Sequence, residues 1–319
     1  MFDKTLRVGT RDSQLALWQA HKVLDLLKVS HFKTQLVATK SAGDLDLTQP
    51  IYAMGIQGVF TKTLDIALLE NRIDLAVHSL KDVPTQLPEG LILAAVLERG
   101  SASDVLVQTH KADLEKVSTI ATGSLRRKAQ WLHRYPQHHL VNLRGNVQTR
   151  MDKLFSSNWE GAIFAKSGLE RSEILGSYFQ ELDWMIPAPA QGAIGIVSRI
   201  EDIDLIEELQ KINHQPTRRC VDIERDFLRI LEGGCSAPIG AHAFVAQNKI
   251  QFKGGVFSLD GRTAATTFKE VEINDGYNLA AEAAKEVLAK GGDQRWGKII
   301  GARQADQQTQ HRQSPEDDW

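Results

Sequence analysis

Cysteine is scarce in this sequence of 319 residues, which contains only Cys220 and Cys235. Two cysteines form at most one disulfide, so the sequence excludes a disulfide-stapled fold and favours a reducing compartment. The ten histidines show no HExxH spacing, and both cysteines are far from any histidine pair. We therefore expect no metal site.

Long apolar runs and an excess of one charge are also absent. No apolar run approaches the roughly 20 residues that span a bilayer. The first residues lack the basic and apolar regions of a secretory signal. The 38 basic and 40 acidic residues give a formal net charge of −2, which is not typical of proteins that bind nucleic acid or membrane surfaces. We expect a cytoplasmic protein with neither kind of partner.

Strand-like and helix-like segments alternate over the first two thirds of the chain. We expect strands at 6–8, 36–38 and 73–77, and helices from 12 or 13 and over 61–70. A second unit has expected strands at 119–121, 140–141 and 161–164, with helices at 125–133 and 147–154. This alternation predicts two α/β units with largely parallel sheets and a ligand cleft between them.

The pattern changes near Pro216. A helix there carries Cys220 on its apolar stripe, which predicts a core residue. Expected strands at 239–245, 250–259 and 263–273 and a last helix at 277–290 indicate an α+β domain with an antiparallel sheet. The polar, glutamine-rich residues 304–319 are predicted to be disordered.

Arginines stand where expected strands meet expected helices, in TGSLRR at 122–127 and LRGNVQTR at 143–150, with Arg11 near Ser13 and Arg171 after Gly168. Helix N-termini and guanidinium groups both favour anions, and carboxylates suit the guanidinium fork. Solvated surface arginines are the alternative for any one of them, but several at equivalent junctions favour a site. Phosphate is the competing ligand, yet no phosphate-binding loop fits its required context.

Two further segments could carry chemistry. In HSLKDVP at 78–84, Asp82 beside Lys81 could act as a general acid or stabilise a developing cation, although an ordinary turn fits as well. Cys235 lies in LEGGCSAPIG at 231–240, an accessible setting for a thiolate, although an inert small residue is equally compatible.

Together these motifs, with QGA at 191–193, resemble those of the hydroxymethylbilane synthases, also called porphobilinogen deaminases, from Arg7 to about Gly301. The resemblance implies two α/β domains like those of periplasmic binding proteins, flanking a cleft, and a small C-terminal α+β domain with an antiparallel sheet. It implies domain one at 1–98 and 190–213, domain two at 99–189, and domain three, which carries the cysteine loop, at 214–303. It also implies a monomer.

The resemblance further implies a transferase of porphyrin and haem biosynthesis. It would deaminate four porphobilinogen molecules and polymerise them into hydroxymethylbilane on a dipyrromethane primer, which it assembles itself and binds through a thioether to Cys235. Asp82 would protonate the leaving amine and stabilise cationic intermediates. The implied cofactor-binding residues are Ser79, Lys81, Asp82, Thr122, Ser124, Arg126, Arg127, Arg144, Gly168 and Cys235. The implied substrate-binding residues are Arg11, Ser13, Phe60, Arg144, Asn146, Arg150, Arg171 and Gln191.

Three positions depart from the family pattern. Gln57 replaces a lysine before the lid residue Phe60, Gly123 replaces a serine, and Val197 replaces an acidic residue. None of these changes touches Asp82 or Cys235, so we expect activity. The alternatives are a non-enzymatic clamshell that binds an anionic small molecule, and a degenerate member that turns over poorly.

Overall fold

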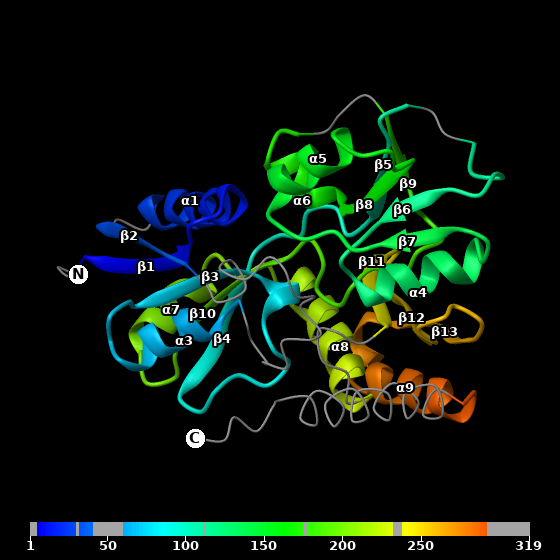
Figure 1. Cartoon of the computed structure of the whole chain (residues 1–319). Coiled ribbons are helices and arrows are strands. Elements are labelled where there is room, and N and C mark those ends of the chain that lie inside the picture. Colours follow the sequence, from blue (N-terminus) through cyan, green and yellow to red (C-terminus); the bar gives the residue numbers. More distant parts are fainter. Residues whose placement is uncertain are drawn as a thin grey trace, which may run out of the picture.

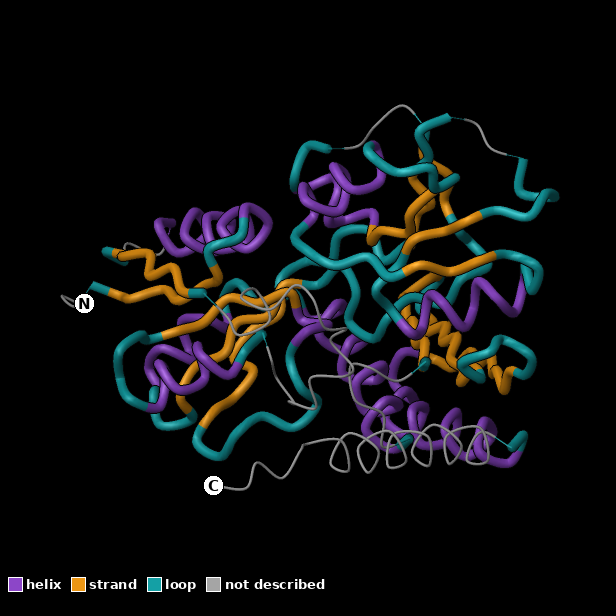
Figure 2. The backbone as a smooth tube through the Cα atoms, viewed as in Figure 1, coloured by secondary structure: helices purple, strands orange, loops and turns teal. Residues whose placement is uncertain are grey.

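Three β-sheets organise the chain over the residues that the computed structural model describes, which are 5–29, 32–40, 60–110, 113–174, 178–231 and 238–291. Two of the sheets have five strands each, and the third has three (Figure 1). Figure 2 shows the same three groups of strands, each with helices beside it. This arrangement confirms the expected fold class of two α/β units and a small C-terminal α+β unit.

The first sheet has the order β2-β1-β3-β10-β4. Its strands are β1 (Leu6–Arg11), β2 (Thr34–Thr39), β3 (Leu75–Ser79), β4 (Leu91–Val96) and β10 (Ile194–Arg199). β1 runs parallel to β2 and β3, but β10 is antiparallel to both β3 and β4. The expectation of a largely parallel sheet was therefore wrong for this strand. β10 returns from far along the chain, and all of its residues are buried, so it lies inside the sheet rather than at an edge.

Helices cover both faces of this sheet. Alternate side chains of a strand point to opposite faces, so a single strand packs against helices on both sides. Leu75 and Val77 of β3 share a core cluster with residues of α1 (Gln14–Val29). Ala76 shares the other cluster with residues of α3 (Lys62–Leu69). A further helix, α7 (Ile203–Gln210), follows β10. The sheet is thus the middle layer of an α/β sandwich.

The second sheet, β7-β6-β8-β5-β9, repeats the pattern of the first. Its strands are β5 (Asp104–Val107), β6 (Thr119–Ala121), β7 (His139–Val141), β8 (Gly161–Ala165) and β9 (Phe179–Glu181), and its helices are α4 (Leu125–Arg134), α5 (Val147–Phe155) and α6 (Lys166–Arg171). β6 is parallel to β7 and β8, and β5 is antiparallel to β8 and β9. The expectation of two similar α/β units is confirmed.

The third unit begins with α8 (Gln215–Ile230) and continues with the antiparallel strands β11 (Ile239–Ala246), β12 (Lys249–Phe257) and β13 (Ala264–Glu272). The 3-10 helix η3 (Ile273–Asn278) leads into α9 (Leu279–Ala289). Phe227 and Phe252 pack with ring centres 5.1 Å apart in a core that also contains Cys220. Cys220 is therefore a core residue, and burial raises the pKa of its thiol to about 11.

Glu224 on α8 joins the third unit to both segments that cross between the sheets. Its carboxylate accepts two hydrogen bonds from Arg99, at 2.6 and 3.0 Å, and one from the backbone N–H of Ala190 at 2.6 Å. It also accepts from the N–H of Ala243 on β11 at 2.7 Å. Glu224 is fully buried, and removing one partner of such a pair costs about 3–5 kcal/mol. The crossing point of the two α/β units is therefore anchored on α8.

Candidate active site

Several of the predicted site residues lie where parallel strands of the two large sheets end. Lys81 and Asp82 follow β3, Ser124 follows β6, and Arg144 follows β7. The carboxyl ends of parallel strands are where open α/β sheets place ligands. The sequence motifs therefore come from two units but share one structural position.

The turn after β3 presents Lys81 and Asp82. It is the short 3-10 helix η2 (Leu80–Asp82), and the backbone N–H of Leu80 donates to the carbonyl of Ala193 at 3.0 Å. Leu80 is fully buried, whereas Lys81 and Asp82 are half-buried. Ser79, the last residue of β3, exchanges hydrogen bonds of 2.8 and 3.1 Å with the Gln19 side chain. Leu80 thus fixes the turn, and the two charged side chains remain accessible.

The electrostatic surroundings of Lys81 show that the two units meet at this turn. The pKa of Lys81 is lowered to about 8, chiefly by burial, with the positive charges of Arg127 and Arg150 adding to the shift and Asp82 opposing it. Arg127 and Arg150 belong to the second unit and Lys81 to the first. Lys81 of the first unit therefore lies within electrostatic range of two cations of the second unit and of the carboxylates Asp82 and Asp104.

Arg126 and Arg127, at the start of α4, are held by a carboxylate that the sequence analysis missed. Asp104 on β5 accepts from Arg126 Nη1 at 2.7 Å and from Arg127 Nε at 2.9 Å. Burial by itself would raise the pKa of Asp104, but the two guanidinium groups lower it to about 2. Arg126 and Arg127 are 4% and 6% exposed, so the interpretation as solvated surface arginines is wrong for them. One carboxylate against two cations leaves a positive charge in place.

Side chains cap the helices that begin at these loops. Ser124 Oγ accepts from the N–H of Arg127 at 3.4 Å, and Asn146 Oδ1 accepts from the N–H of Thr149 at 2.8 Å. Thr122 Oγ1 accepts from the N–H of Ser124 at 3.2 Å. The caps fix where each helix starts, and the helix dipoles add to the positive potential of the loops.

The loop after β7 and the helix α5 that follows it add one cation each. Arg144 is 4% exposed, and Arg150 Nε donates to the carbonyl of Gly145 at 2.7 Å. Burial lowers the pKa of Arg150 to about 10, with Arg127 and Arg144 adding to the shift and Asp82 opposing it. The cations that follow β6 and β7 are therefore close enough to shift one another's pKa.

These two loops are in close backbone contact at Gly123. A Cβ atom at this position would lie 2.4 Å from the carbonyl oxygen of Leu143. The serine that the family pattern has here does not fit this arrangement without a backbone shift. Gly123 therefore does more than remove a hydroxyl, since it lets the loop with Arg144 approach α4.

A small pocket lies between α1 of the first unit and α6 of the second. Gln19, Ser79 and Lys81 line one side, and Gly168 and Arg171 line the other. Arg171 Nη2 donates to the carbonyl of Gly192 at 2.6 Å, and its Cζ lies 5.5 Å from the centre of the Trp18 ring. Arg171 thus joins α6 to the crossing segment and to α1.

Arg11 and Phe60 form a separate contact on the first unit. The Arg11 Cζ lies 4.4 Å from the centre of the Phe60 ring, a cation–π geometry. Ser13 Oγ accepts from the N–H of Ala16 at 3.3 Å near the start of α1. Burial lowers the pKa of His78 to about 4, and the positive charge of Arg11 adds to the shift.

Two of the residues that the sequence singled out cannot be placed. Cys235 and Gln57 lie outside the described residues. Val197 is fully buried in β10 and packs in the core of the first unit, so its departure from the family pattern lies away from the charged loops. Gln191 Nε2 donates to Asp104 at 3.0 Å and to the carbonyl of Ala102 at 2.7 Å, so it supports the carboxylate beneath the arginines.

The described part of the chain contains no cluster of three potential metal ligands. Nor does it include a helix with the length and apolar character needed to cross a bilayer.

Cationic loops from two α/β units, with a small pocket between α1 and α6, define a class of protein suited to a ligand with several carboxylates, and comparison with known proteins narrows that class. Residues 6–207 match the family model described as porphobilinogen deaminase, dipyromethane cofactor binding domain. Residues 218–289 match the porphobilinogen deaminase C-terminal domain. The chain belongs to the porphobilinogen deaminase family.

Individual relatives agree with the family models. The chloroplastic porphobilinogen deaminase of Oryza sativa subsp. japonica is 40% identical over 301 residues, which cover 90% of this chain and 84% of that protein. The porphobilinogen deaminase of Desulforamulus reducens is 40% identical over 294 residues, which cover 90% and 95%.

Among solved structures, an ancestral cationic amino acid solute-binding protein is similar with a TM-score of 0.45 and 14% identity. The match covers 67% of this chain and 90% of that one.

Proposed function

We propose that this protein deaminates porphobilinogen and joins four molecules of it into hydroxymethylbilane, in porphyrin and haem biosynthesis. One observation carries the proposal beyond family membership: the half-buried carboxylate of Asp82 interacts with Lys81 of the first unit and with Arg150 of the second. A carboxylate suits a cation that develops during reaction, and the surrounding cations suit anionic substituents.

The charges fit a dipyrromethane cofactor. Each of its two pyrrole rings carries two carboxylates, and the loops around Asp82 offer more cations than Asp104 neutralises. We propose that Lys81, Arg127 and Arg144 bind these carboxylates and that Ser124 and the N–H groups at the start of α4 add hydrogen bonds. Arg126 and Thr122 would hold this loop in place, and Gly168 and Ser79 would line the wall between α1 and α6.

When bound, the cofactor supplies the pyrrole carbon to which new units are added. The family resemblance assigns its covalent attachment to Cys235. The Asp82 carboxyl would deliver a proton to the departing amine, which leaves as ammonia. Its carboxylate form would then stabilise the positive charge left on the substrate ring. Each addition breaks the carbon–nitrogen bond of the departing amine and forms one carbon–carbon bond, and the ring carbon that attacks gives up its proton.

Substrate carboxylates would bind chiefly to Arg11, Arg150 and Arg171. Ser13 and Asn146 cap helices, and Gln191 holds Asp104. We therefore propose that Ser13, Asn146 and Gln191 position the arginines that bind the substrate. Phe60, stacked on Arg11, would cover the bound ring.

We further propose that the protein acts as a cytoplasmic monomer, with porphobilinogen as its small-molecule partner and without nucleic acid or membrane. A non-enzymatic clamshell is not favoured, because binding alone gives Asp82 no task and does not account for two matched enzyme domains.

The substitution Asp82→Asn tests the proposal. The amide keeps the size of the side chain and loses both the acid and the charge, so we expect ammonia release from porphobilinogen to fall at least about 100-fold with an unchanged fold. Asp183→Asn, at an exposed aspartate on the second unit, is the control and should retain full activity. Near wild-type release of ammonia by the Asp82 variant would refute the assigned role.

A further inference from the structure

α8 of the third unit packs directly on the first unit beneath the turn that carries Asp82. Arg218, Val221 and Arg225 stand three and four residues apart, so they share one face of the helix. Val221 is fully buried in the same cluster as Leu80 and Val83. The turn and α8 therefore belong to one packed body.

Arg225 holds the backbone that follows Asp82. Its Nη1 donates to the carbonyl of Val83 at 2.9 Å, and its Nη2 donates to the carbonyl of Pro84 at 2.7 Å. These are the first two carbonyls after Asp82 in the chain. A planar guanidinium that makes two such bonds fixes orientation as well as position, which the single ammonium of a lysine does not do. With Leu80 bound to Ala193 on the other side, the turn is held at both ends.

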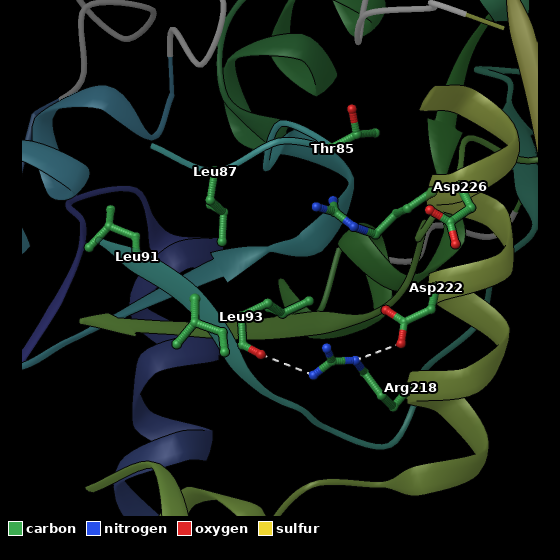
Figure 3. Close-up of a pocket in the computed structure, with 9 residues that line it drawn as sticks. Thr85, Leu87, Leu91, Leu93, Arg218, Asp222 and Asp226 are labelled. Atoms are coloured by element: carbon green, nitrogen blue, oxygen red, sulfur yellow. Dashed lines mark hydrogen bonds and ion pairs between the residues drawn. The ribbon is translucent and has the colours of Figure 1, made fainter. Parts of the chain in front are cut away.

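A cavity of about 380 Å³ lies beside these contacts, and it is lined by residues of α8, of the edge strand β4 and of the segment after the turn (Figure 3). None of the described residues that the sequence assigned to the active site lines it. Arg225 lines this cavity. The guanidinium that bonds to the Val83 carbonyl therefore borders open space. Small guanidinium ions could therefore enter from the cavity if the side chain were removed.

Arg218 provides an internal comparison in the same cavity. It donates to the carbonyl of Leu93 on β4 at 3.0 Å and pairs with Asp222 at 2.8 Å, as the dashed lines in Figure 3 show. Both arginines thus come from one face of one helix and bond to backbone carbonyls of the first unit. Only Arg225 bonds to the turn that presents Asp82.

We propose that Arg225 is a positioning residue for the reaction: it holds the turn so that Asp82 faces the cations of the second unit. A shift of about 1 Å in a reacting group can cost about 100-fold in rate, so two bonds beside Asp82 have a large effect. α8 ends shortly before Cys235 in the sequence. The helix that leads to the cofactor cysteine therefore also fixes the position of the Asp82 carboxyl. The inference rests on the proposed function.

Arg225→Ala and Arg218→Ala in the full-length protein test the inference. Each is incubated with porphobilinogen, and ammonia release, KM and intact mass are measured with and without millimolar guanidinium chloride. We expect Arg225→Ala to lose at least about tenfold in kcat with KM changed less than twofold, and to regain at least fivefold with guanidinium. Arg218→Ala should keep kcat within about twofold of the wild type and gain nothing. If the Arg225 variant carries no cofactor, the rescue is measured on the rate of mass increase.

Equal losses in the two variants, or no rescue of Arg225→Ala, would reduce Arg225 to a packing contact and overturn the inference. If Arg225→Ala does not fold, Arg225→Lys replaces it. This variant keeps the stem and charge but loses the fork, so we expect a kcat reduction of about tenfold, and wild-type kcat would overturn the inference. A wild-type protein that releases no ammonia would instead refute the proposed function, so the two failures are distinguishable.

Discussion

Replacing Asp104 by asparagine should destabilise the protein strongly, because this carboxylate compensates two buried guanidinium groups. Asp104 is fully buried and bonds to Arg126 at 2.7 Å, to Arg127 at 2.9 Å and to Gln191 at 3.0 Å. The asparagine keeps one acceptor oxygen and loses the negative charge, so two cations remain in the interior without a counter-ion.

The magnitude follows from two estimates. The pKa of Asp104 is lowered from 3.8 to about 2, which corresponds to about 2 kcal/mol of stability from the ionised form. Breaking a buried ion pair by removing one partner costs about 3–5 kcal/mol. Protonation leaves an acid that still forms hydrogen bonds with its neighbours, so the first figure is a lower bound, and we expect a loss of about 3 kcal/mol.

Urea unfolding at pH 7 measures this loss. The control is Glu181→Gln on the neighbouring strand β9, which breaks a partly exposed pair with Lys166 and should cost less than about 1 kcal/mol. Since the pKa of Asp104 is lower in the folded than in the unfolded state, its contribution is present above pH 4 and is lost as the pH falls towards 2. The variant should lack this loss. A destabilisation at pH 7 no larger than that of the control would refute the reasoning.

Two further predictions concern the loops. In a Cys235→Ser protein, acylation of Lys81 should increase with pH around a midpoint near 8, because burial lowers its pKa to that value and only the neutral amine reacts. Peptide mapping measures the acylation, and a midpoint near 10 would contradict the prediction. Gly123→Ser should lower kcat/KM by about tenfold or stability by about 1–3 kcal/mol, because its Cβ would meet the Leu143 carbonyl at 2.4 Å and displace Arg144. Wild-type kinetics and unfolding would show that the loops yield without cost.

Much of the fold follows from local patterns. The helix predicted from Leu125 begins at that residue because Ser124 caps it, and the antiparallel sheet of the third unit has its predicted strands. β10 was not predicted, because its direction depends on the chain returning from the second unit. No local signal in residues 194–199 encodes a partner that is more than a hundred residues away along the chain.

The site was predictable as a set of cations but not as a network. Arg126 and Arg127 stand out because they open a helix after a strand. Asp104 gave a weaker signal, a single acid at the start of a short apolar strand, and its partners are more than twenty residues away. Arg225 carries no local signal at all, because its role depends on α8 docking on the turn after β3.

The intact mass of the purified protein, measured before and after addition of porphobilinogen, tests whether the protein carries a covalent primer and extends it. We expect a resting mass above the sequence mass by one dipyrromethane, further pyrrole-sized steps with substrate, and a Cys235→Ser variant that remains at its own sequence mass. A folded wild-type protein that stays at the bare sequence mass with porphobilinogen present would contradict the account.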